Sequence, residues 1–220
     1  MTSVLYLCRF PQLQAPCSFL LRYLSNAYDR VTSSFSEEYF QMVFSGRYLS
    51  RPDILNPTGD RPICYVNYDV EDAMEVYRMI PIHLIPNAKF HGFADVKVLS
   101  IGNVLQEYIH SHEYYEEIWI DEANEFDLYE SIRQEIQDNS VVANAILHAQ
   151  QEMMSTTHPL LILKDLELLH PYDKIGRVEQ LIYKKIEIPI LILYPGNTQG
   201  SARIFLNIYP MDGSYRSKNF

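Results

Sequence analysis

Short runs of uninterrupted aliphatic residues, alternating with segments of helical spacing, constrain this fold most. Residues 160–163 are Leu-Leu-Ile-Leu, and residues 188–193 are aliphatic apart from Pro189. Strands of this kind are buried on both faces, which is typical of a parallel sheet covered by helices. The pattern therefore predicts a three-layer α/β fold with a mostly parallel sheet flanked by helices.

The remaining elements follow from periodicity, propensity and the positions of proline and glycine. We expect strands at 63–68, 96–101, 160–163, 188–193 and 204–206, and helices at 71–79, 102–110, 126–136, 141–154 and 178–185. Residues 18–31 and 35–48 have helical spacing, and 50–62 is a connector rich in proline. The interpretation is one α/β domain over 1–220, with a helical lead-in (1–60) and a sheet-containing core (61–220).

A sheet of this class raises the question of nucleotide binding. A phosphate loop needs closely spaced glycines, a lysine for the phosphates and a hydroxyl for magnesium. The first expected strand instead continues as Tyr68-Asp69-Val70-Glu71-Asp72, and none of the eight glycines forms such a motif. The sequence therefore predicts no working phosphate loop and no ATPase activity.

Other chemistry is equally weakly indicated. Asp165 ends an expected strand, but the partners that would hold magnesium are missing, so we expect a helix or turn cap. His110 and His112 are two apart, so on a helix they point to different faces and cannot chelate together. The three cysteines form no zinc pattern. We expect no enzyme, no metal and no cofactor.

Charge is concentrated in one segment. Residues 113–138 hold ten acids and one base, Arg133, and so carry −9 of the formal net charge of −10. This segment is either a solvated helical surface or a docking face for a basic partner. The candidate acidic docking face consists of Glu113, Glu116, Glu117, Asp121 and Glu122.

Nucleic-acid binding is not expected, because the basic residues are not clustered and the densest group is Lys184-Lys185. Trp119, the single tryptophan, is interpreted as a core anchor, with an interface hot spot as the alternative.

The segment 194–200, Tyr-Pro-Gly-Asn-Thr-Gln-Gly, follows a buried strand and is expected to be a loop. Ligand sites of open α/β sheets lie beyond the carboxyl ends of strands, so this loop is a candidate ligand or partner surface. The alternative is a plain turn whose glycines supply positive φ. The candidate residues are Tyr194, Pro195, Gly196, Gly200, Arg203, Tyr215 and Arg216.

The compartment is expected to be the cytoplasm. The N-terminus lacks a basic region followed by a long apolar stretch, so it does not look like a signal peptide. The longest apolar run, 188–194, is far shorter than the roughly 20 residues of a membrane span. We therefore expect no membrane association.

The last third of the chain resembles the BrxB family, small proteins encoded in the BREX phage-defence systems of bacteria. The resemblance is carried by Leu160–Asp165, His170-Pro171, 178–182, Ile188–Gly196, Gly200, Arg203–Leu206 and Tyr215-Arg216, with a weaker match at Asn67-Tyr68-Asp69. Val70 and Glu71 stand where the family often has a proline, and the final four residues also differ from the family pattern.

The resemblance implies an accessory protein without assigned catalytic activity that acts with other system members, such as the PglZ alkaline-phosphatase-like protein. It also implies a relative of phosphate-loop ATPases that lost the loop. Self-association stays open. The alternative from the residues themselves is a small-ligand or nucleotide-binding protein, or an enzyme, that uses Tyr68, Asp69, Asp165 and the 194–200 loop.

Overall fold

The structure is a computed structural model that describes residues 63–90, 92–115, 119, 125–199, 202–209 and 218–219. The expected helical lead-in, 1–60, lies outside the described residues.

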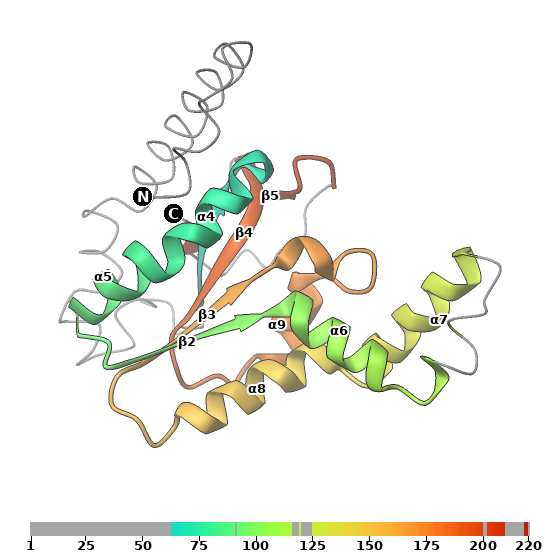
Figure 1. Cartoon of the computed structure of the whole chain (residues 1–220), viewed down its shortest axis with the longest axis horizontal. Helices are drawn as coiled ribbons and strands as arrows, with labels where there is room; N and C mark the ends of the chain where they lie inside the picture. The colour runs from blue at the N-terminus through green and yellow to red at the C-terminus, as the bar shows by residue number, and fades with distance from the viewer. Residues whose placement is uncertain are drawn as a thin grey trace, which may run out of the picture.

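A mostly parallel sheet forms the centre of the fold, as predicted (Figure 1). Its strands are β1 (Ile63–Tyr68), β2 (Asp95–Ser100), β3 (Pro159–Lys164), β4 (Ile190–Gln199) and β6 (Lys218–Asn219), in the order β2-β3-β4-β1-β6. All neighbours in this order pair in parallel, whereas β5 (Ala202–Phe205) pairs antiparallel to β4. The α/β fold class is therefore confirmed.

One face of the sheet is covered by the connection from β1 to β2. It consists of a 3-10 turn, η4 (Val70–Asp72), helix α4 (Ala73–Met79), a π-helical turn, η5 (Ile80–Leu84), and helix α5 (Ile85–Phe90). Val76, Met79 and Leu84 pack there against Ile162 and Leu193 of the sheet.

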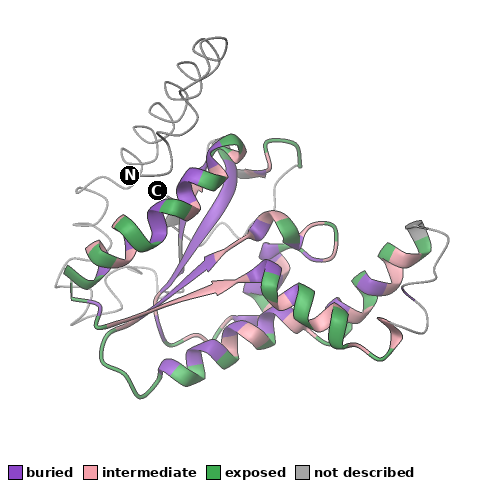
Figure 2. Ribbon diagram, in the orientation of Figure 1, coloured by how far each residue is buried: buried purple, intermediate pink, exposed green. Residues whose placement is uncertain are grey.

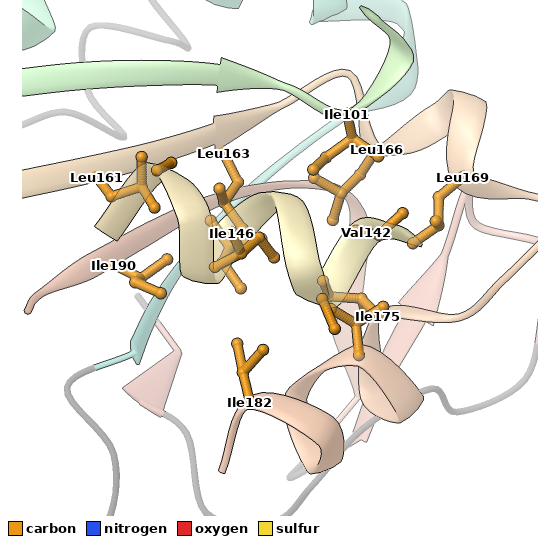
Figure 3. Close-up of a cluster of buried hydrophobic side chains, with 14 of the residues drawn as sticks. Ile101, Val142, Ile146, Leu161, Leu163, Leu166, Leu169, Ile175, Ile182 and Ile190 are labelled. Atoms are coloured by element: carbon orange, nitrogen blue, oxygen red, sulfur yellow. The ribbon is translucent and has the colours of Figure 1, made fainter. Parts of the chain in front are cut away.

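The opposite face is covered by α6 (Ile101–Ser111), α8 (Val141–Met153), the 3-10 turn η7 (Leu166–Leu169) and α9 (Ile175–Ile182). Helix α7 (Glu125–Asp138) packs against α8 at the end of this layer (Figure 1). Figure 3 shows the resulting core, in which side chains of α8 and α9 meet those of β3 and β4.

The alternation of side chains along a strand explains why β3 is aliphatic throughout. Leu161 and Leu163 point into the core under α8, while Leu160 and Ile162 point into the core under α4 and α5. Successive side chains leave a strand on opposite faces, so a strand covered on both sides needs apolar residues at every position. Figure 2 shows β3 and β4 buried, whereas the edge strand β2 is half-buried.

Helix α9 begins and ends three residues earlier than the helix expected at 178–185. It ends before Lys184, which has a left-handed φ of 66°. Ile175, Val178 and Ile182 are buried at helical spacing, so packing against the sheet fixes the register despite Gly176.

The expected loop 194–200 is a larger departure, because β4 continues through Gln199 and forms a hairpin with β5. Pro195 is tolerated because it lies opposite Tyr68, where β1 ends, and only its carbonyl is needed: it accepts a hydrogen bond from the Leu206 amide at 2.9 Å. Gly196 has a φ of 135°, a backbone angle that residues with a side chain rarely adopt.

Candidate functional site

The direction of the connections creates a switch point at the carboxyl end of the sheet. The helices after β1 lie on one face, and those after β2 and β3 lie on the other, while β4 separates β1 from β3. Open α/β sheets bind ligands where the strand order reverses in this way. The residues at the ends of β1, β2 and β3 are therefore the first place to look for a site.

A polar cluster occupies this place; we call it the switch-point cluster. It consists of Tyr68, Tyr77, Ser100, Lys164, Asp165 and Glu167. Tyr68, Ser100 and Lys164 are the last residues of three strands, Tyr77 comes from α4, and Glu167 comes from η7.

Glu167 joins the two faces of the sheet. Its carboxylate accepts hydrogen bonds from the Tyr68 hydroxyl at 2.5 Å and from the Tyr77 hydroxyl at 2.5 Å, one on each oxygen. The two hydroxyls also lie 3.1 Å apart. Hydrogen bonds to an ionised group are stronger than neutral ones, so this triad ties β1, α4 and η7 together.

Asp165 organises the other half of the cluster. Its carboxylate accepts a hydrogen bond from the Ser100 hydroxyl and lies 2.7 Å from the Lys164 ammonium. The ammonium in turn lies 4.8 Å from the centre of the Tyr77 ring. Ser100 also caps α6 by accepting the Asn103 amide at 3.1 Å.

The expectation that Asp165 caps a helix or turn is only half right. Asp165 occupies the position before η7, with a left-handed φ of 61°, but its side chain makes no capping hydrogen bond. The carboxylate bonds with Ser100 and Lys164 instead.

Both cluster tyrosines remain protonated. Burial raises the pKa of Tyr68 far above its ordinary value, and the adjacent Glu167 carboxylate raises it further. Burial, followed by the hydrogen bond to Glu167, also raises the pKa of Tyr77. Neither phenol can serve as a base or a nucleophile near neutral pH, so both act as hydrogen-bond donors.

The connection after β1 offers no cradle for phosphate. It turns directly into α4 through η4, with the Asp72 amide bonded to the Asp69 carbonyl at 2.8 Å. Asp69 and Glu71 are exposed there, and Asp72 is buried. A polyphosphate would meet the exposed acids Asp69 and Glu71, which follow Tyr68 and its carboxylate partner Glu167, and these acids repel it.

The candidate surface around Tyr194 does not form as expected. Tyr194, Pro195 and Gly196 are buried in β4, so they are packing residues and present no contact surface. The Tyr194 ring makes edge contacts with Tyr65 and Phe205, at centroid distances of 5.7 and 5.6 Å. Arg203 lies on β5 opposite Thr198, while Gly200, Tyr215 and Arg216 lie outside the described residues.

The acidic docking face is described only at Glu113, which is exposed; Glu116, Glu117, Asp121 and Glu122 lie outside the described residues. Trp119 is a core anchor, as predicted: it is 5% exposed, and its indole nitrogen donates to the Ser131 hydroxyl at 3.1 Å. His112 stacks on its ring at a centroid distance of 4.8 Å. Within the described ranges, no three His, Cys, Asp or Glu side chains gather as a metal site requires.

Sequence reasoning named Tyr68 and Asp165 but missed Tyr77, Ser100, Lys164 and Glu167. Tyr77 and Glu167 are ninety residues apart in the chain and on opposite faces of the sheet. One signal was available: both a strand end and the turn after it carry charged residues, Lys164, Asp165 and Glu167, where a covered sheet is otherwise apolar.

The raised pKa of Tyr68 gives a stability prediction. In the folded state Tyr68 keeps its proton above pH 10, whereas the unfolded chain loses it near its ordinary pKa of 10.0. The contribution of Tyr68 to the free energy of unfolding is therefore complete below pH 10. Above pH 10 it falls by at most about 1.4 kcal/mol per pH unit. Urea unfolding at increasing pH should show a shallower alkaline decline for Tyr68→Phe than for wild type; equal slopes would contradict the prediction.

Comparison with protein-family models, with curated proteins and with solved structures finds no match to this chain. The resemblance to the BrxB family thus stays a prediction from the residues quoted above. Among the described residues, no helix is long and apolar enough to cross a membrane.

Proposed function

We propose that this chain is a non-catalytic, partner-binding accessory component of a BREX-type antiphage system, acting in the bacterial cytoplasm through protein–protein contacts. The partner that we infer is another protein of the system, with the PglZ-like protein as the first to test. Direct binding to nucleic acid or to a membrane is not part of the proposal.

The observation that carries the non-catalytic part of the proposal is that the groups of the switch-point cluster are bonded to one another; we call this the closed cluster. Asp165 accepts a hydrogen bond from Ser100 and forms an ion pair with Lys164. Glu167 accepts hydrogen bonds from the hydroxyls of both tyrosines. A nucleotide site at this place would need donors directed at phosphate. The cluster instead contains two carboxylates whose hydrogen-bonding partners all belong to the cluster, which supports a structural role.

The partner and the system are supported by the resemblance of the last third of the chain. The residues that carry it include the segment Ile188–Gly196 and Arg203–Leu206. In the structure, these stretches build the β4–β5 hairpin and its approach, and Ile190–Gly196 and Phe205 are buried. The resemblance therefore supports a shared architecture as well as a shared system.

The alternative was a small-ligand or nucleotide site in a loop at 194–200. Residues 194–199 belong to a strand, so this loop is not present there. A ligand-binding protein or an enzyme that uses another surface stays a competing hypothesis. It is tested together with the partner proposal in the two experiments that follow.

Co-expression tests the partner directly. Size-exclusion chromatography with light scattering should show this chain co-eluting with a co-expressed PglZ-like protein, at a mass that fits a complex. Repeating the run at low and moderate salt separates a packed interface from attraction between charges. Separate elution in both conditions would remove the PglZ-like protein as the direct partner.

A nucleotide screen tests the closed cluster. We expect ATP, GTP and their magnesium complexes to move the melting temperature by less than about 1 °C, since Ser100 and Lys164 at the described strand ends are already paired with Asp165. A ligand at 100 times its dissociation constant would add roughly 2.7 kcal/mol and shift the melting temperature by several degrees. A shift of that size would overturn the non-catalytic proposal in favour of nucleotide binding.

A further inference from the structure

A groove runs along the surface beside η7 and α9, and we call it the α7–α9 groove. One half is lined by Leu169, Ile175, Phe205 and Tyr209, and the other by Tyr129, Glu130, Arg133, Gln137, Pro171 and Arg177. His170, Asp173 and Lys174 line both halves, so the two are adjoining pockets. The groove is apart from the switch-point cluster and shares no residue with it.

The first half of the groove is apolar and aromatic. The rings of His170 and Tyr209 stack at a centroid distance of 4.0 Å, with Phe205 buried behind them. Tyr209 keeps 37% of its surface exposed. An exposed aromatic stack beside buried aliphatic residues suits the side chain of an apolar residue.

The second half is cationic, and its central cation is fixed in place. One nitrogen of the Arg177 guanidinium donates to the Asp173 carboxylate at 2.9 Å, and another donates to the Gln137 carbonyl at 2.6 Å. The Asp173 side chain is 1% exposed and also accepts the Lys174 amide at 2.7 Å. Asp173 thus positions Arg177, and its buried carboxylate is already bonded to neighbouring protein groups.

The other two cations are exposed. Lys174 makes no ion pair with any described residue, and Arg133 pairs with Glu130 on the same helix, with both side chains nearly half exposed. Exposed pairs of this kind contribute little, so Arg133 can exchange its partner at low cost. The second half holds three cations against two acids, Glu130 and Asp173, and so carries a net charge of +1, whereas the whole chain carries −10. This local excess of positive charge favours an acidic ligand.

From this division we propose that the α7–α9 groove is the docking site of the partner protein. The occupant that fits is a short partner segment with an apolar side chain next to a carboxylate: the apolar group lies against the His170–Tyr209 stack, and the carboxylate meets Lys174 and Arg133. This inference rests on the proposed partner-binding function. It adds the surface and the chemistry of the segment bound.

The test uses random short peptides displayed on phage and selected on the full immobilised chain. The selected peptides should share an acidic residue, Asp or Glu, beside a large apolar residue. Measured by fluorescence anisotropy, their affinity should fall at least tenfold for the double variant Arg133→Glu/Lys174→Glu and for Tyr209→Ala. The matched control is Lys89→Glu/Lys185→Glu, which makes the same charge change at exposed positions outside the groove and should bind as wild type does.

Two results would overturn the inference: selection that enriches no such peptides, or peptides that bind the groove variants as tightly as wild type. Melting temperatures near that of wild type show that the variants are folded, as expected of exposed positions. Co-elution of the partner with Arg133→Glu/Lys174→Glu would sink the groove while the proposed function stands. Peptide binding that maps to the groove, without any co-eluting partner, would support the groove and count against the PglZ-like protein as the partner.

Discussion

Replacing Gly196 with alanine should lower the free energy of unfolding by about 3 kcal/mol or more, the combined cost of a disfavoured φ and a clash with backbone. A Cβ at this position would lie 2.0 Å from the Ile204 carbonyl oxygen and 3.0 Å from the Leu206 amide nitrogen. Both are backbone atoms, one in β5 and one in the residue that follows it, so the clash cannot be relieved by rotating a side chain. The φ of 135° adds strain that an alanine cannot relieve without leaving the strand.

The consequence extends to the groove. Gly196 pairs with Phe205, and the chain turns after Phe205 to place Tyr209 on His170. A hairpin that opens at Gly196 would displace Phe205 and Tyr209 together. We therefore expect Gly196→Ala to lose affinity for groove-selected peptides even under conditions where it is still folded.

Gly102→Ala is the matched control for this substitution. Its Cβ would meet the Cδ1 atom of Leu168 at 2.4 Å, but Leu168 is an exposed, flexible side chain that can rotate away. Gly102 lies within α6, where alanine is favoured over glycine by roughly 0.5–1 kcal/mol. Urea unfolding followed by Trp119 fluorescence should show a large loss for Gly196→Ala and little change for Gly102→Ala; equal midpoints would contradict the steric argument.

The sheet could be predicted from the sequence because its signal is local and redundant. Leu160–Leu163 is apolar at four consecutive positions between Pro159 and Lys164, as is typical of a short strand covered on both faces. The bounds of β1 agree with the prediction at both ends. The order of the strands is different, because it depends on which edges pair across the whole chain and no local pattern records that.

The hairpin was missed because two principles compete at Tyr194-Pro195-Gly196. Proline and glycine in succession are typical of a turn, and the prediction followed that rule. The structure uses both residues inside a strand: Pro195 lies where β1 ends, and Gly196 lets the Ile204 carbonyl approach closely. Burial of Tyr194 between Tyr65 and Phe205 stabilises this arrangement.

The switch-point cluster depends on contacts that no sequence pattern contains. Asp165 could be placed at a strand end, but its partner Ser100 ends a different strand, and the register that aligns Ser100 with Lys164 is a property of the sheet. The α7–α9 groove is similar, since Arg133, Lys174 and Tyr209 come from three separate segments. For both, the residue types were visible and their proximity was not.

Removing the Glu167 carboxylate is the second substitution with a large expected effect. Glu167→Ala removes the acceptor of the Tyr68 hydroxyl, and Tyr68 is only 7% exposed. The Tyr77 hydroxyl, 3.1 Å away, is then the cluster group that remains beside it. A hydrogen bond to a charged group contributes about 1.5–3 kcal/mol, and a buried donor left unsatisfied costs about 1–3 kcal/mol. Because Glu167 is only half-buried and water can partly replace it, we expect a net loss of about 2 kcal/mol in the free energy of unfolding.

A double-mutant cycle separates this bond from other effects of the substitution. Glu167→Ala is measured in the wild-type chain and in Tyr68→Phe/Tyr77→Phe, where no hydroxyl is left to donate. The loss should shrink to less than about 1 kcal/mol in the second background, because the phenylalanine rings need no acceptor. An unchanged loss would mean that Glu167 stabilises η7 by another route, and the two faces of the sheet would then not be joined through this carboxylate.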